Sequence, residues 1–170
     1  MNKSLSSLLL TIRPATVEDI PIIQDIVRET WPVTYTSIIG KDQVDYMIQQ
    51  FYSDSSLNHQ MEDNHCFFLA LKQYVPVGFA SFSPVSDSIY KLQKLYVLSG
   101  EQKTGAGKAL LQTVEEATKS IGAAKLQLNV NRKNMAKSFY EKNGFVIIKE
   151  TDIDIGNGYF MNDYIMQKNL

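Results

Sequence analysis

The sequence predicts one domain of the α+β class, in which helices cover a mixed, mostly antiparallel sheet. The chain has 170 residues and is 44% hydrophobic, which is enough for a single core of ordinary size. Its apolar residues recur at helical spacing in some segments and alternate in others. These segments follow the order strand, two helices, three strands, helix, strand, helix and two strands, which is not the regular strand and helix repeat of a parallel sheet.

The first elements are a short strand and two helices. Thr16 suits a helix N-cap, and Asp19 follows three residues later. Apolar residues at intervals of three and four then form one face of the first helix, and Trp31 and Pro32 are expected to end it. The predicted ranges are 12–15 for the end of the strand, 17–30 and 41–52 for the helices, and 57–62 for a shorter helical turn.

Three strands separated by short turns come next and predict an antiparallel meander. Cys66 stands beside Phe67 and Phe68 in the first of them, and we expect it to be a small buried hydrophobic residue rather than a nucleophile. The predicted strand ranges are 66–71, 75–82 and 89–98.

The second half of the chain contains the clearest helix, which Gly122 is placed to end. A strand with alternating apolar residues follows it, then a helix that Gly144 stops. Two final strands flank the turn 156–158. The predicted ranges are 104–121 and 134–143 for the helices, and 125–130, 145–155 and 159–167 for the strands.

Composition excludes several classes of partner. Lys and Arg number 17 against 18 Asp and Glu, for a net charge of −1, and no basic block suggests nucleic acid. No apolar run approaches the roughly 18 residues of a membrane span, and residues 1–10 lack the features of a secretion signal. The lone Cys66 cannot form an internal disulfide, so we expect a cytoplasmic protein. His59 and His65 have no ligand cluster around them, and no metal is assigned.

A glycine-rich segment, QKTGAGKAL at 102–110, opens the clearest helix. Backbone N–H groups at such a helix start favour an anion. A triphosphate P-loop does not fit, because Ala109 stands where Ser or Thr is needed and Gln102 where the first glycine belongs. The dinucleotide fingerprint fails as well, since Leu110 takes the place of its third glycine.

Two motifs resemble those of the Gcn5-related N-acetyltransferases (GNAT). The pattern Gln102-x-x-Gly105-x-Gly107 follows the strand LQKLYV and is similar to the family's coenzyme A motif. The segment NMAKSFYEKNGF at 134–145 is similar to N-x-x-A-x-x-F-Y-x-K-x-G-F, with its alanine displaced by one residue. The resemblance implies one N-acetyltransferase domain over 1–170, with a three-layer αβα arrangement of six to seven strands and about four helices, and acetyl-CoA (coenzyme A) as co-substrate.

The resemblance also implies the cofactor site. Backbone amides at 104–108 would cradle the pyrophosphate, and the strand before the loop would pair through its main chain with the pantetheine arm. Asn134 is predicted to be both the N-cap of its helix and a contact to the pantetheine or acetyl region. The cofactor-binding candidates are Leu95, Tyr96, Val97, Gln102, Lys103, Thr104, Gly105, Ala106, Gly107, Lys108, Asn134 and Tyr140.

Tyr140 is the catalytic candidate that the resemblance supplies. A phenol with an ordinary pKa near 10 can protonate the coenzyme A thiolate as it leaves, although this tyrosine could also simply pack beside its aromatic neighbours. Many members of the family place a glutamate as base on the strand before the loop, where this chain has Gln93. The base therefore stays unassigned. Trp31, Tyr35 and Gln93 are the substrate candidates, with Trp31 alternatively a core residue.

The predicted activity is transfer of an acetyl group to a primary amine by direct attack in a ternary complex. The segments TWPVTY and DYIMQKNL are similar to those of bacterial members that acetylate polyamines, so a small-molecule amine acceptor such as a polyamine is expected. The alternatives are acetylation of a protein or peptide amine and a catalytically silent acyl-CoA-binding regulator. A homodimer could form by pairing of edge strands near the C-terminus.

Overall fold

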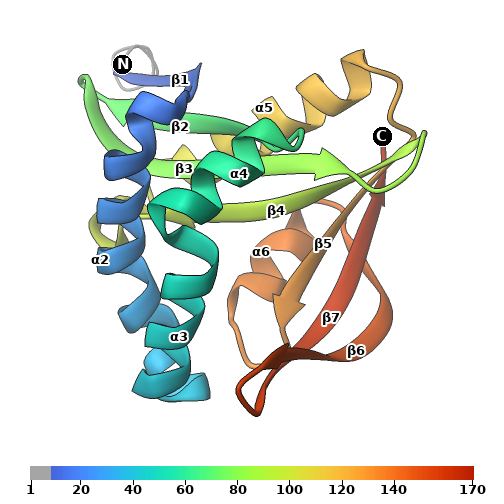
Figure 1. The fold of residues 1–170 in the computed structure, drawn as a ribbon. Coiled ribbons are helices and arrows are strands. Elements are labelled where there is room, and N and C mark those ends of the chain that lie inside the picture. The colour runs from blue at the N-terminus through green and yellow to red at the C-terminus, as the bar shows by residue number, and fades with distance from the viewer. Residues whose placement is uncertain (1–8) are drawn as a thin grey trace.

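The computed structural model describes residues 9–170 and contains one seven-stranded sheet (Figure 1). Residues 1–8, most of the segment used to exclude a secretion signal, lie outside this range. The strands are β1 (Leu10–Pro14), β2 (Cys66–Lys72), β3 (Val75–Pro84), β4 (Ile89–Val97), β5 (Lys125–Asn131), β6 (Val146–Gly156) and β7 (Tyr159–Asn169). The helices are α2 (Ile20–Ile39), α3 (Lys41–Tyr52), α4 (Asp54–Glu62), α5 (Ala106–Ser120) and α6 (Ala136–Lys142), with 3-10 turns η1 (Val17–Asp19) and η2 (Ser99–Glu101).

The sheet order is β1-β2-β3-β4-β5-β7-β6, and every pair of neighbours is antiparallel except β4 and β5. This topology confirms the predicted α+β class and the mixed, mostly antiparallel sheet. The meander of β2, β3 and β4 is also confirmed. The structure has one helix more than predicted, because the short helical turn expected at 57–62 is part of a full helix, α4.

Two hydrophobic cores lie on opposite faces of the sheet. One joins α2, α3 and α4 to the sheet, and the other joins α5 and α6 to its opposite face (Figure 1). Successive side chains of β5 point to opposite faces of the sheet. Leu126, Leu128 and Val130 are therefore buried in one core, and the residues between them are less buried. The result is the predicted three-layer arrangement. No helix within residues 9–170 is long and apolar enough to cross a membrane.

The predicted end of the first helix at Trp31 and Pro32 is wrong. Helix α2 continues through Pro32 to Ile39 and stops at Gly40, whose φ of 82° is left-handed. A proline inside a helix removes one backbone hydrogen bond and costs about 3 kcal/mol. Packing offsets this cost, since Trp31 is only 4% exposed and its ring lies 4.6 Å from that of Tyr35. The added turns carry Tyr35 to the site described below.

The prediction that Cys66 is buried is also wrong, because its side chain is exposed. Cys66 is the first residue of β2, and its neighbour Phe67 is 3% exposed and takes the inward position at this end of the strand. Successive side chains of a strand point to opposite faces. A cysteine beside phenylalanines therefore need not share their burial.

The start of α2 is fixed by a buried carboxylate, which gives a stability prediction. Asp19 accepts two hydrogen bonds of 2.8 Å from the guanidinium of Arg13 and one of 2.9 Å from the backbone N–H of Thr16. These contacts lower the pKa of Asp19, chiefly through Arg13. We expect Asp19→Asn to lower the free energy of unfolding by about 1–3 kcal/mol at pH 7, measured by urea denaturation.

The stability lost in Asp19→Asn should depend on pH, because the pKa of Asp19 is lowered in the folded protein. A carboxylate whose folded pKa is lowered stabilises the fold above its ordinary pKa of 3.8, and this stabilisation disappears as the pH falls through the lowered value. The difference between wild type and Asp19→Asn should therefore shrink at acid pH. Asp25→Asn is the control, since Asp25 and Arg28 form an exposed ion pair of little expected worth. An equal loss at both pH values would contradict the assignment.

Candidate active site

Strands β4 and β5 separate part of the way along, and this opening creates the site. They pair in parallel only between Ile89–Leu92 and 125–128, although β4 continues to Val97 and β5 to Asn131. Beyond Leu92, no strand described within residues 9–170 pairs with the edge of β4 that faces β5. Unpaired N–H and C=O groups at such an edge can pair with an extended ligand.

A cleft of about 730 Å³, here called the large cleft, lies at this opening. Its walls come from α2, β4, β5, the loop after β4, and the starts of α5 and α6. Several predicted cofactor residues line it, namely Leu95, Tyr96, Val97, Gln102, Gly107, Asn134 and Tyr140. The others lie in the adjoining loop and the first turn of α5 without lining the cleft, namely Lys103, Thr104, Gly105, Ala106 and Lys108.

The start of α5 presents free backbone N–H groups beside the large cleft. Gly105 is the N-cap residue and has a left-handed φ of 88°, which glycine adopts without strain. The first hydrogen bond of the helix runs from the N–H of Ala109 to the carbonyl of Gly105 at 2.9 Å. The amides of residues 106–108 therefore have no partner inside the helix. Together with the helix dipole, they form a site suited to a phosphate group.

Tyr140 lines the large cleft from α6, with 7% of its surface exposed. Its ring packs between Phe139 and Phe145, at centroid distances of 5.3 and 5.8 Å. Burial raises the pKa of Tyr140, and Tyr35 raises it further. Within residues 9–170 its hydroxyl has no hydrogen-bond partner. It is thus a protonated phenol at neutral pH that is free to donate to a ligand.

Asn134 connects the start of α6 to α2. Its side-chain oxygen accepts a hydrogen bond of 2.9 Å from the N–H of Ala136, and its amide nitrogen lies 3.4 Å from the hydroxyl of Tyr35. The capping role is therefore present, although the N-cap position itself belongs to Met135 rather than to Asn134. The contact with Tyr35 depends on the extension of α2 beyond Pro32.

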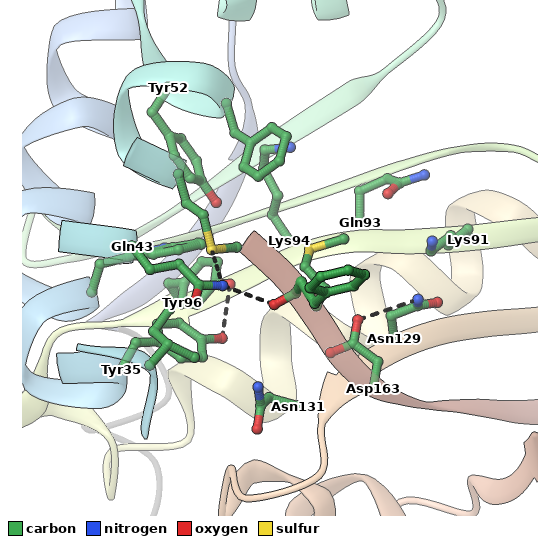
Figure 2. Close-up of a pocket in the computed structure, with 16 residues that line it drawn as sticks. Tyr35, Gln43, Tyr52, Lys91, Gln93, Lys94, Tyr96, Asn129, Asn131 and Asp163 are labelled. Carbon is green, nitrogen blue, oxygen red and sulfur yellow. Dashed lines mark hydrogen bonds between the residues drawn. The ribbon is translucent and has the colours of Figure 1, made fainter. Parts of the chain in front are cut away.

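A second cavity of about 190 Å³, here called the small cavity, lies on the side of the sheet that α2 and α3 cover. Figure 2 shows its polar side chains converging from α2, α3, β4, β5 and β7. The predicted substrate residues Trp31, Tyr35 and Gln93 all line it. The residues that the sequence did not indicate are Gln43, Met47, Phe51, Tyr52, Lys91, Lys94, Asn129, Asn131, Phe160, Met161 and Asp163, with Tyr96 predicted only for the cofactor.

The two cavities share part of their walls. The residues common to both are Tyr35, Gln93, Lys94, Tyr96 and Asn129. The hydroxyls of Tyr35 and Tyr96 lie 3.2 Å apart at this junction, and burial raises the pKa of both phenols. They are neutral at physiological pH and cannot act as bases. Gln93 donates its amide to Ser83 at 3.0 Å and is likewise no base.

A β-bulge explains why Gln93 and Lys94 both line the small cavity. Ser81 of β3 pairs with Lys94, but the next residue, Phe82, pairs with Leu92, so Gln93 is an extra residue. A bulge of this kind changes which face the following side chains occupy. Strict alternation would have sent these two neighbours to opposite faces of the sheet.

The small cavity contains both signs of charge. Within residues 9–170, Asp163 is the only acidic side chain that lines either cavity; it is 6% exposed, and burial raises its pKa. Lys94 lies over the rings of Tyr52 and Phe67, at 5.4 and 5.9 Å from their centroids. Burial lowers the pKa of Lys94 to about 8, and Lys91 adds to the effect.

Several known proteins are similar to this chain. Residues 36–162 match the family described as "Acetyltransferase (GNAT) domain". The spermidine N(1)-acetyltransferase of Thermoplasma acidophilum is 27% identical over 165 residues, which are 94% of this chain and 96% of the relative. The uncharacterized N-acetyltransferase YuaI of Bacillus subtilis is 28% identical over 138 residues, 78% of each chain.

Solved structures match over almost the whole chain. The PaiA N-acetyltransferase of Thermoplasma acidophilum, solved in complex with coenzyme A, superposes with a TM-score of 0.80 at 27% identity, over 95% of this chain and 99% of that one. A GCN5-related N-acetyltransferase from Rhodopseudomonas palustris superposes with a TM-score of 0.81 at 22% identity, over 94% and 95%. This second match bears on the fold alone.

Proposed function

The chain belongs to the GNAT acetyltransferase family and uses acetyl-CoA as co-substrate, and on that premise we propose that it acetylates the primary amine of a small molecule. Acetyl-CoA binds in the large cleft and the acceptor amine in the small cavity. The observation that carries this proposal is the junction, where Tyr35, Gln93 and Asn129 line both cavities. Donor and acceptor can therefore meet in one ternary complex, without a covalent enzyme intermediate.

The described residues fit coenzyme A along its length. The unpaired edge of β4 at 95–97 can pair with the amide groups of the pantetheine arm. The free N–H groups of residues 106–108 suit the pyrophosphate, and Gly107 leaves the backbone open to close approach. Gln102 contributes to the same wall. In this arrangement the thioester lies near Tyr140 and the junction.

In the proposed reaction the acetyl group passes directly from the sulfur of acetyl-CoA to the nitrogen of the acceptor. The lone pair of the neutral amine attacks the thioester carbon, so that a C–N bond forms and the C–S bond breaks. The electron pair of the C–S bond goes to sulfur, which takes a proton from the hydroxyl of Tyr140. The nitrogen loses its surplus proton to solvent, and solvent reprotonates Tyr140. Because the pKa of Tyr140 is raised, the phenol stays protonated until negative charge develops on the leaving sulfur.

The experiment that tests this function is acetyl-CoA-dependent release of free thiol, measured across polyamines, amino acids, aminoglycosides and short peptides against a blank without acceptor. We expect one class of small amine to accelerate release. The relative from Thermoplasma acidophilum is named a spermidine acetyltransferase, which supports a polyamine as the acceptor. A response confined to peptides would favour a protein or peptide acceptor. Tight acetyl-CoA binding with a flat response would favour the silent regulator instead.

A cytoplasmic location, a single acetyltransferase domain over 1–170 and a homodimer are further proposals carried from the sequence. The dimer has some structural support. β6 is an edge strand of the sheet, and its residues Val146, Ile147 and Ile148 are exposed. An apolar edge strand is a common site for pairing with a second copy across a two-fold axis.

A further inference from the structure

The charges of the small cavity are unsuited to a polyamine. Its only acidic side chain among residues 9–170 is Asp163, whereas Lys91 and Lys94 both line it. A polyamine carries two or more ammonium groups at neutral pH, and only one of them could lie beside Asp163. The others would share the cavity with two lysines of the same charge, in surroundings that screen charge less than water does.

Lys94 lies in the cavity without a counter-ion. Its ammonium forms no ion pair with any carboxylate of residues 9–170. The faces of Tyr52 and Phe67 offset part of the cost of removing this charge from water, but they carry no negative charge. With its pKa lowered only to about 8, the side chain is still mainly cationic at pH 7. It therefore presents a positive charge that an anion would match.

The carboxylate of Asp163 and the ammonium of Lys94 contact different walls of the small cavity. Asp163 is 3.4 Å from the amide of Asn129, which lines both cavities, so the carboxylate is near the junction. Lys94 lines both cavities, but its ammonium lies over Tyr52, which lines only the small cavity (Figure 2). No ion pair joins Asp163 to Lys94. The cavity thus offers a carboxylate beside the junction, with Lys91 near enough to counter part of the rise in its pKa that burial causes, and a second ammonium, that of Lys94, turned toward Tyr52.

We propose that the acceptor is a small amine that also carries a carboxylate, an amino acid in the broad sense, with its ammonium at Asp163 and its carboxylate at Lys94. This inference rests on the proposed function and narrows its substrate class. The size of the cavity agrees, since 190 Å³ is below the roughly 300 Å³ at which pockets for drug-sized ligands begin. Its aromatic walls, among them Trp31 and Phe160, suit the apolar part of such a molecule.

Asp163 has a further task in this arrangement. An ammonium must lose a proton before its nitrogen can attack the thioester, and neither Gln93 nor the phenols at the junction can accept that proton. The carboxylate of Asp163, beside Asn129 at the junction, can accept it directly or through a water molecule. It would pass the proton to solvent after each turnover.

The test compares matched acceptors that differ only in the carboxylate. Suitable pairs are phenylalanine with phenethylamine, and lysine with 1,5-diaminopentane; spermidine is added as the polyamine. We expect kcat/KM of the wild type to favour the carboxylate member by about 10- to 100-fold, the range for a hydrogen bond between charged groups. Lys94→Met keeps an unbranched side chain that is one atom shorter and removes its charge. In this variant the ratio within each pair should fall toward one.

Two further variants separate recognition from structure. Lys94→Arg keeps the charge and should keep most of the preference. Lys149→Met removes a charge from an exposed position on β6 and should leave the ratio unchanged. A wild type that prefers spermidine or the diamine would overturn this inference alone, as would a Lys94→Met variant that lowers both members of a pair equally. No thiol release from any amine, in protein that binds acetyl-CoA, would overturn the proposed function itself.

Discussion

Replacing Tyr140 by phenylalanine should lower kcat about 100- to 1,000-fold, the usual contribution of a positioned general acid. The KM for acetyl-CoA should change little, because the ring that lines the large cleft remains. Stability should not fall, since the hydroxyl of Tyr140 has no hydrogen-bond partner within residues 9–170 and its loss leaves no group unpaired. Steady-state kinetics and thermal unfolding of the same preparation measure the two effects.

Tyr90→Phe is the matched control for Tyr140→Phe. Tyr90 also packs against a phenylalanine, at 6.1 Å from the ring of Phe82, but it lines neither cavity. Its variant should keep full turnover. If Tyr140→Phe kept full turnover as well, with native unfolding behaviour, Tyr140 would be a packing residue and another donor would have to protonate the sulfur.

Local features of the chain were predictable because local interactions determine them. The glycine-rich loop, the amphipathic pattern of α5 and the alternation of β5 each depend on residues close together in the sequence. The residues that were correctly predicted to line the large cleft come from the same part of the chain, between Leu95 and Tyr140. These short segments also carry the two family motifs, which is why the fold and the cofactor could be inferred together.

The acceptor side depends on contacts between distant parts of the chain. The amide of Gln43 on α3 donates to the carbonyl of Phe160 at 2.8 Å, across 117 residues. Asp163 enters the cavity because β7 pairs with β5 in a register that places it opposite Asn131. The register between two strands that are distant in the chain cannot be read from a single sequence. The family resemblance therefore indicated Trp31, Tyr35 and Gln93, but it indicated neither Asp163 nor Lys94.

The bulge in β4 and the continuation of α2 through Pro32 could not be predicted from the sequence for a different physical reason. In each case tertiary packing outweighs a local preference, since the bulge turns Lys94 toward α3 and the packing of Trp31 carries α2 past Pro32. The bulge lies where the two cavities meet, and the part of α2 beyond Pro32 brings Tyr35 to the same place. Irregular backbone is often found at functional sites, where side chains must be directed to a ligand.

Gly107→Leu should raise the KM and the dissociation constant for acetyl-CoA by about 100-fold, or roughly 2.7 kcal/mol. Gly107 lines the large cleft, and a Cβ there would lie 3.8 Å from Phe139 and from Val97. These are ordinary contacts, so the fold can accept the first carbon. The remaining carbons of leucine must extend into the space that we assign to coenzyme A.

Gly100→Leu makes the same chemical change where it should have little effect. A Cβ at Gly100 meets nothing within 4 Å, and the residue lies in η2 without lining the large cleft. Calorimetric titration of both variants with coenzyme A, after confirming native unfolding behaviour, separates the two positions. If Gly107→Leu bound coenzyme A as tightly as Gly100→Leu, the cofactor would have to bind away from the start of α5, and the free amides there would need another ligand.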